Sequence, residues 1–319
     1  TNEITIADTQ FCYMPLISIS TYKSPFWLRN AHLATVIPSI FRKVEGVDYN
    51  RERIITPDDD FIDLDWLKNG SNKLLLLAHG LEGDSKRHYM KGPAKYFRNK
   101  GWDVVAWNCR SCSGEINKQP RLYHHADTED LDTILKYINE KNDYTEIVLA
   151  GFSMGGSIIL KYLGEKRVKE NSITKAVTFS VPCDLKDSAV TLSKKGRSFY
   201  RKKFLDKLKM KIKQKASVYP DKFNLEGIDT IEHFPEFEEQ FTAPIHGFKN
   251  ADDFYQKASA KNYLHGIEIP TLIVNAVNDP FFSEACYPFD EVENLEHVYL
   301  ETPKRGGHVG FMLSKKECW

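Results

Sequence analysis

The stretch LAGFSMGGSIIL, residues 149–160, decides the fold. An apolar run leads into Gly151, Ser153 stands between glycines, and a second apolar run follows. This order predicts a buried strand, a sharp turn and a helix, and Gly151-x-Ser153-x-Gly155 matches the pattern of a nucleophile elbow. Because a glycine-rich turn with an incidental serine would have the same pattern, the rest of the chain has to distinguish the two.

Similar apolar runs occur on both sides of this stretch. They are KLLLLAHG (73–80), DVVAWNC (103–109), EIVLAG (146–151), KAVTFSVP (175–182) and TLIVNAV (271–277). Such runs are typical of parallel strands buried on both faces, and segments of helical pattern at 90–100, 128–141 and 155–165 separate them. ERIITP (52–57) and FIDLDWL (61–67) alternate instead, which predicts an antiparallel hairpin at a sheet edge. The chain is therefore predicted to be an α/β protein with a mostly parallel, doubly wound sheet.

The alternation of strands and helices stops after Cys183. Residues 184–262 begin with a basic run, in which apolar side chains recur at helical spacing, and continue with an acidic, aromatic run. We expect a helical lid there, inserted into a core formed by residues 1–183 and 263–319. The basic run could contact anionic phospholipid or a substrate phosphate. A simpler interpretation is a solvated helix face whose charge is balanced by the acidic run.

A nucleophilic serine needs a base, and the base needs an acid to orient it. At an elbow of this type the partners follow in the order serine, acid, histidine. Asp279 and His308 each follow an apolar run late in the chain, at the strand ends where open α/β sheets build their sites. We therefore predict a triad of Ser153, Asp279 and His308. Asp290 is a weaker alternative acid, and the amide of Asn278 could not stabilise an imidazolium ion.

An oxyanion needs preorganised donors, and two backbone N–H groups are candidates. One belongs to Met154 at the start of the predicted helix, and the other to Leu81 in the loop HGLEGD (79–84). The same loop matches the HxxxxD pattern of another class of acyltransferases. Because the motif begins at a strand end, we interpret the match as coincidence and expect His79, with Gly80, to support the loop.

Composition excludes several other functions. The 319 residues hold 44 basic and 44 acidic side chains, so no net charge favours nucleic acid as a partner. No run approaches the roughly 20 apolar residues of a membrane span, and no leader is evident, so we expect a cytoplasmic protein, with peripheral membrane contact left open. Six scattered cysteines do not suggest a disulfide scaffold. We interpret Cys109 and Cys112 as ordinary loop thiols, and expect neither metal nor cofactor.

Several segments together carry a family resemblance. They are HGLEGD (79–84), WNCRSCSGE (107–115), RLYHHADTEDL (121–131), GFSMGGSIILKYLGE (151–165), TAPIHGF (242–248), NAVNDPFF (275–282) and GGHVGF (306–311). In this order they resemble the YheT-like branch of the α/β-hydrolases. The chain departs from the branch at Ser111, where glycine is usual, and at Asp84-Ser85, where a serine pair is usual.

The resemblance implies the α/β-hydrolase fold and the same three triad residues. Its segments also suggest Tyr123, His124 and His246 as pocket or loop support. The expected function is hydrolysis of carboxylic esters, acyl or lipid-like small molecules, through an acyl-enzyme. The aromatic side chains of the insertion suggest an apolar acyl chain. An acyltransferase using an alcohol as acceptor would need the same triad. A catalytically silent binding protein would not need a complete triad.

Overall fold

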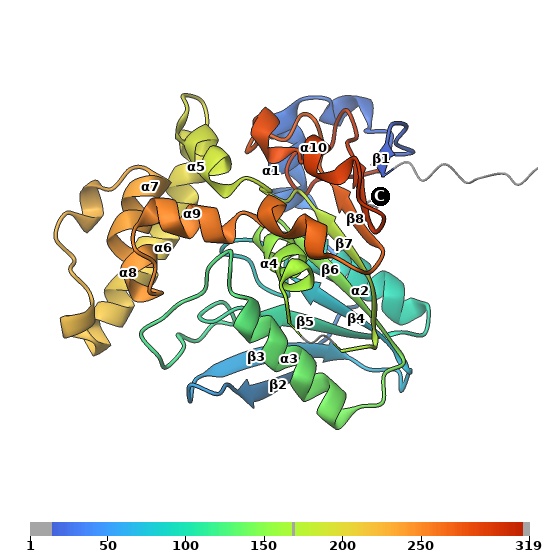
Figure 1. Ribbon diagram of the computed structural model, residues 1–319, viewed down its shortest axis with the longest axis horizontal. Coiled ribbons are helices and arrows are strands. Elements are labelled where there is room, and N and C mark those ends of the chain that lie inside the picture. Colours follow the sequence, from blue (N-terminus) through green and yellow to red (C-terminus); the bar gives the residue numbers. More distant parts are fainter. Residues whose placement is uncertain (1–14, 168–169, 315–319) are drawn as a thin grey trace, which may run out of the picture.

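One sheet organises the molecule (Figure 1). The computed structural model describes residues 15–167 and 170–314, so Cys12, Cys318 and the predicted outer limits at residues 1 and 319 lie outside it. Nine strands of the described part run in the order β1-β9-β8-β7-β6-β4-β5-β3-β2. They are β1 (Leu16–Ile17), β2 (Asn50–Ile55), β3 (Phe61–Leu67), β4 (Lys73–Ala78), β5 (Asp103–Asn108), β6 (Glu146–Phe152), β7 (Ile173–Phe179), β8 (Thr271–Val274) and β9 (Val298–Glu301).

The central strands are buried on both faces. On β4, Leu74 and Leu76 pack in the core that contains α3 (Thr128–Lys141) and α4 (Met154–Gly164). Leu75 and Leu77 point the other way, into the core shared with α2 (His88–Asn99). Because both faces are covered by helices, every position of such a strand can be apolar. The predicted doubly wound, mostly parallel sheet is confirmed.

The sequence predicts the strands at one edge of the sheet but not the strand at the other. At one edge, β2 and β3 form the predicted antiparallel hairpin, and β3 also pairs antiparallel with β5. At the other edge, β1 pairs parallel with β9 and was not predicted. A strand of two residues has no period from which it could be recognised. It is followed by η1 (Phe26–Leu28) and α1 (Ala31–Phe41), which lies near the carboxyl edge of the sheet.

The described residues between β7 and β8 form helices and turns. They are α5 (Leu185–Ser193), α6 (Ser198–Val218), η2 (Pro220–Lys222), η3 (Ile228–Thr230), α7 (Phe234–Phe237), η4 (Glu238–Thr242), α8 (Ala243–Ile245), α9 (Ala251–Ala258) and η5 (Ala260–Gly266). Elements α5–α9 project together from one side of the sheet (Figure 1). After β8 come η6 (Glu284–Cys286) and α10 (Phe289–Val292). No helix in the described ranges is long and apolar enough to cross a membrane.

Candidate active site

Ser153 lies on a strained turn between β6 and α4. Its φ of 52° and ψ of −117° are unusual for a residue with a side chain, and such strain often marks functional positions. The turn is tight because α4 packs directly on the sheet. A Cβ at Gly155 would lie 2.3 Å from the carbonyl oxygen of Ala78, and one at Gly151 would lie 2.7 Å from Gly155. The glycines on either side are therefore required by close backbone contact.

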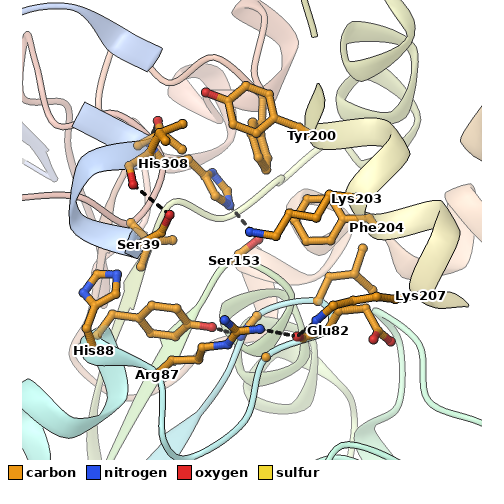
Figure 2. Close-up of a pocket in the computed structure, with 18 of the residues that line it drawn as sticks. Ser39, Glu82, Arg87, His88, Ser153, Tyr200, Lys203, Phe204, Lys207 and His308 are labelled. Atoms are coloured by element: carbon orange, nitrogen blue, oxygen red, sulfur yellow. Dashed lines mark hydrogen bonds between the residues drawn. The ribbon is translucent and has the colours of Figure 1, made fainter. Parts of the chain in front are cut away.

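The three predicted triad residues lie in one chain of hydrogen bonds. His308 Nε2 is 3.0 Å from Ser153 Oγ (Figure 2). On the other side of the ring, His308 Nδ1 is 2.8 Å from Asp279 Oδ2. The other oxygen of the buried Asp279 accepts the N–H of Phe281 at 2.9 Å, and the Phe281 ring stacks on His308 at 3.9 Å between centroids. With its proton on Nδ1, His308 can accept the serine proton at Nε2.

The loop that carries His308 is held by side chains from three distant segments. The backbone N–H groups of residues 307, 308 and 309 donate to Asn278 Oδ1, Thr35 Oγ1 and Ser180 Oγ at 3.0, 2.9 and 2.9 Å. The sequence did not point to Thr35 or Ser180, because a single hydroxyl far away in the chain carries no pattern. Asn278 appeared there only as a neighbour of the acid. Asp290, the alternative acid, is exposed on α10.

Both ring nitrogens of His79 are hydrogen-bonded to backbone groups, so His79 does not serve as a catalytic base. Its Nδ1 donates to the carbonyl oxygen of Gly80 at 2.8 Å, and its Nε2 accepts the N–H of Cys109 at 3.0 Å. Complete burial lowers the pKa of His79 to about 4, so the ring is neutral. These contacts join His79 to the backbone at Gly80 and Cys109, and leave neither nitrogen free to act as the base of an HxxxxD pair.

The two predicted oxyanion donors lie at turns beside Ser153. Met154 is the first residue of α4, so its N–H has no acceptor within the helix. Leu81 lies in a turn closed by the N–H of Gly83, which donates to the oxygen of Gly80 at 2.9 Å. The following residue, Glu82, donates its N–H to Tyr123 Oη at 3.0 Å, and this hydroxyl donates back to Glu82 Oε1 at 2.5 Å.

Two cavities meet at Ser153. They share Leu81, Ser153, Phe204, Phe281 and His308. The first opens between α1, the loop after β4 and the start of α6, and Gly80 also lines it (Figure 2). The second lies beneath α5 and α7, and is mostly apolar. It is further lined by His125, Pro182, Leu185, Ser188, Ala189, Leu192, Phe234, Glu238, Tyr255 and Phe282.

The other predicted pocket residues do not line either of the cavities at Ser153. Tyr123, His124 and His246 surround a third cavity, which contains Leu81 but not Ser153. The rings of His124 and His246 are 4.3 Å apart, and burial lowers the pKa of both. Tyr123 supports the loop through Glu82, whereas the two histidines do not line the serine cavities. His125, the next residue in the chain, lines the apolar cavity and was not predicted.

The CxxC pair has the chemistry of buried thiols. Burial raises the pKa of Cys109 and raises that of Cys112 to about 11. Zinc ligands and redox cysteines act as thiolates, which these surroundings disfavour. Within the described residues, no group of three or more His, Cys, Asp or Glu side chains is placed to hold a metal ion.

Fold and site together define a class. The sequence model of the family described as "alpha/beta hydrolase fold" matches residues 73–315, so the chain belongs to the α/β-hydrolase family. Within it, the chain belongs to the YheT-like branch. It is 32% identical to YheT of Escherichia coli (strain K12) over 290 residues, which are 89% of this chain and 84% of that protein.

Two further relatives share less sequence identity with this chain. Phospholipase ABHD3 of Mus musculus is 27% identical over 94% of this chain and 75% of its own length. Monoacylglycerol lipase of Saccharomyces cerevisiae is 26% identical over 82% of this chain and 58% of its own. Among solved structures, the esterase Pf2001 of Pyrococcus furiosus superposes with a TM-score of 0.57 at 18% identity, covering 85% of this chain and 89% of that one. That similarity shows the shared fold.

Proposed function

We propose that this protein hydrolyses carboxylic esters through an acyl-enzyme on Ser153. One observation carries the proposal: the hydrogen bonds that run from buried Asp279 through His308 to Ser153, at the elbow between β6 and α4. The names of the relatives agree with ester chemistry, since one is called a phospholipase and another a monoacylglycerol lipase.

The first half of the reaction forms the acyl-enzyme. Ser153 Oγ attacks the ester carbonyl carbon while His308 Nε2 takes its proton, and Asp279 stabilises the imidazolium that results. Negative charge then develops on the carbonyl oxygen. The N–H groups of Met154 and Leu81 would donate to it, each contributing about 3 kcal/mol or more. His308 passes its proton to the alcohol oxygen as the carbon–oxygen bond breaks.

The second half returns the enzyme to its starting state. His308 Nε2 accepts a proton from water, and the resulting hydroxide oxygen attacks the acyl carbon. The tetrahedral intermediate collapses, the carboxylic acid leaves, and Ser153 recovers its proton from His308. Each proton transfer uses the same nitrogen, which the bond from Nδ1 to Asp279 keeps directed at the serine.

The helical insertion, residues 184–262, is proposed as a lid over this site. Residues 1–183 and 263–319 are proposed to form the core that carries it. Side chains of α6 cover the first cavity, and α5 and α7 cover the second. Leu185, Ala189 and Leu192 give the second cavity an apolar wall, which suits an acyl chain.

The proposal is tested by covalent labelling. A fluorophosphonate probe should label the wild-type protein, and Ser153→Ala should abolish labelling and lower ester hydrolysis by at least about 10³-fold. Ser157→Ala, one turn further along α4, is the matched control and should keep both. Equal labelling of the Ser153 variant, or a folded wild-type protein that resists the probe, would refute the assignment. p-Nitrophenyl esters of increasing chain length, with and without ethanol, then separate hydrolysis from acyl transfer.

A further inference from the structure

Three cationic side chains line the first cavity beside Ser153. Lys203 and Lys207 come from α6, and Arg87 is the residue before α2. In Figure 2, Lys203 extends from α6 across the cavity in the direction of Ser153 and His308. Among the described residues, no lysine or arginine lines the second cavity at the same serine. One side of the reaction centre is therefore cationic and the other apolar.

The three cations are not neutralised by the protein. In residues 15–167 and 170–314, none of them has a carboxylate oxygen within 4.0 Å. Arg87 Nη2 and Lys207 Nζ contact the backbone oxygen of Glu82 at 3.0 and 3.5 Å, and this oxygen carries no formal charge. The Lys203 side chain makes no hydrogen bond in those ranges.

Glu82 is the only acidic residue that lines this cavity in the described part of the chain. Its Oε1 accepts Lys211 Nζ at 2.6 Å and the hydroxyl of Tyr123 at 2.5 Å. The carboxylate is therefore already paired within the protein. It does not offset the charges of Arg87 and Lys203.

The remaining lysines of α6 have structural partners. Lys213 pairs with Asp229 at 2.6 Å. This ion pair joins the basic run to the acidic run, whose charges were expected to balance. Lys209 and Lys215 donate to backbone oxygens, and Lys211 pairs with Glu82. Lys203 and Lys207 differ from them because they face the cavity. Lys207 Nζ also has a long contact with the core, to the backbone oxygen of Glu82 at 3.5 Å, whereas the Lys203 side chain has no hydrogen bond within the described residues. Holding the insertion on the core therefore does not explain Lys203.

Like charges in one cavity oppose folding unless something offsets them. Lys203 is exposed on the helix but lines the same cavity as Arg87 and Lys207. Desolvation there and the charges of Arg87 and Lys207 lower the pKa of Lys203, as expected for like charges that share one cavity. A bound anion would remove this repulsion. Phosphate and carboxylate groups are the anions that arginine and lysine bind in proteins.

We propose that the preferred substrate is an ester whose alcohol part carries an anionic group, such as a phosphate, bound by Arg87, Lys203 and Lys207. Its acyl chain enters the apolar cavity under α5 and α7. The inference rests on the proposed function, since it names the substrate class of the same site. In the reaction the acyl carbon–oxygen bond breaks, the anionic alcohol leaves with the proton from His308, and the phosphate ester bond stays intact.

A matched set of esters tests the proposal. Hexanoyl glycerol is neutral, hexanoyl glycerol 3-phosphate adds the anion, and hexanoyl glycerophosphocholine places a cation beside it. We expect kcat/KM for the phosphate compound to exceed that for the neutral one by about 10- to 100-fold. The choline compound should lose most of this preference. Raising ionic strength from about 20 to 500 mM should reduce the preference in the wild-type enzyme, because salt screens the attraction.

Two variants refine the test. In Lys203→Gln/Lys207→Gln the ratio of phosphate to neutral rates should fall to near 1. Lys202→Gln, at the neighbouring position that pairs with Asp206 and does not line this cavity, should keep the wild-type ratio. The salt measurement needs no variant, so the proposal remains testable if the double variant does not fold.

The outcomes separate this proposal from the proposed function. Equal rates for phosphate and neutral esters, in an enzyme that labels with fluorophosphonate, would overturn the anion site and leave the hydrolase intact. No hydrolysis of any ester and no labelling would overturn both. The neutral ester and the phosphate ester are then measured again with oleoyl chains, in vesicles of neutral lipid, to identify the source of the anion. If the oleoyl phosphate ester is hydrolysed faster than the hexanoyl one, the anion belongs to a lipid headgroup. If the hexanoyl phosphate ester is faster, the substrate is a small soluble phosphate ester; both results support the site.

Discussion

Lys211 of α6 and Glu82 of the loop after β4 form a buried ion pair, with Nζ and Oε1 2.6 Å apart and side chains 10% and 5% exposed. Glu82 directly follows Leu81, whose N–H is the proposed oxyanion donor. The pair therefore ties the insertion to the loop that carries the proposed donor. It gives a physical route by which the position of α6 would affect the proposed catalysis.

Lys211→Met should cost about 3 kcal/mol of stability, because it leaves the Glu82 carboxylate buried without its cation. It should also lower kcat by about 10-fold or more, since the loop holding Leu81 loses an anchor. Lys213→Met is the control, because Lys213 and Asp229 are 44% and 79% exposed and such a pair contributes at most about 1 kcal/mol. Urea denaturation and ester kinetics measure both effects. Similar losses in the two variants would show that the buried pair has no special role.

Asp279→Asn should reduce kcat by about 10⁴-fold while the protein stays folded. An amide at this position would favour the wrong tautomer of His308 and would not stabilise its protonated form. Asp290→Asn removes the alternative acid, which is exposed on α10, and should leave the rate unchanged. Single-turnover kinetics and circular dichroism on both variants provide the measurement. A large loss in Asp290→Asn would mean that the acid has been misassigned.

Thr35→Val should weaken catalysis through position alone. Thr35 Oγ1 accepts the N–H of His308 at 2.9 Å and donates to the oxygen of Ala31 at 2.8 Å. Valine keeps the volume but leaves this N–H without its partner, which costs about 1 to 3 kcal/mol. We expect slower labelling by fluorophosphonate and a lower kcat. Thr35→Ser restores the hydroxyl and should restore both rates; a failure of this rescue would point to packing instead.

The sequence predicted most of the sheet and the meeting of the three triad residues. Both follow from local patterns: apolar runs mark strands buried on both faces, and chemistry-bearing residues just after such runs share the carboxyl edge. What it could not predict depends on contacts between distant segments. Thr35 and His308 are 273 residues apart in the chain, and no periodicity connects a lone hydroxyl to a loop. Likewise, the sequence HH does not tell which of His124 and His125 lines a cavity shared with Ser153.

The sequence also did not indicate that the side chain of Glu238 is buried between two cavities. It lies at the boundary between the apolar cavity and the cavity around His246, and its Oε2 has no hydrogen-bond partner in the described residues. Burial raises the pKa of Glu238 from an ordinary value near 4.5 to about 7. Below pH 4.5 the group is neutral in both states. Between pH 4.5 and 7 the folded protein retains a proton that the unfolded chain has released.

Stability should therefore fall as pH rises through this window, and the contribution of the proton is lost above pH 7. Glu238→Gln keeps the position neutral at every pH. Its stability advantage over the wild-type protein should grow by about 2 to 3 kcal/mol between pH 4.5 and pH 8, measured by urea denaturation at each pH. Glu232→Gln, at an exposed position of the same insertion, controls for removing a charge that remains in water. If the difference between Glu238→Gln and the wild-type protein stays constant across these pH values, the carboxyl group is ionised in the folded state throughout, and the apolar cavity has a charged wall.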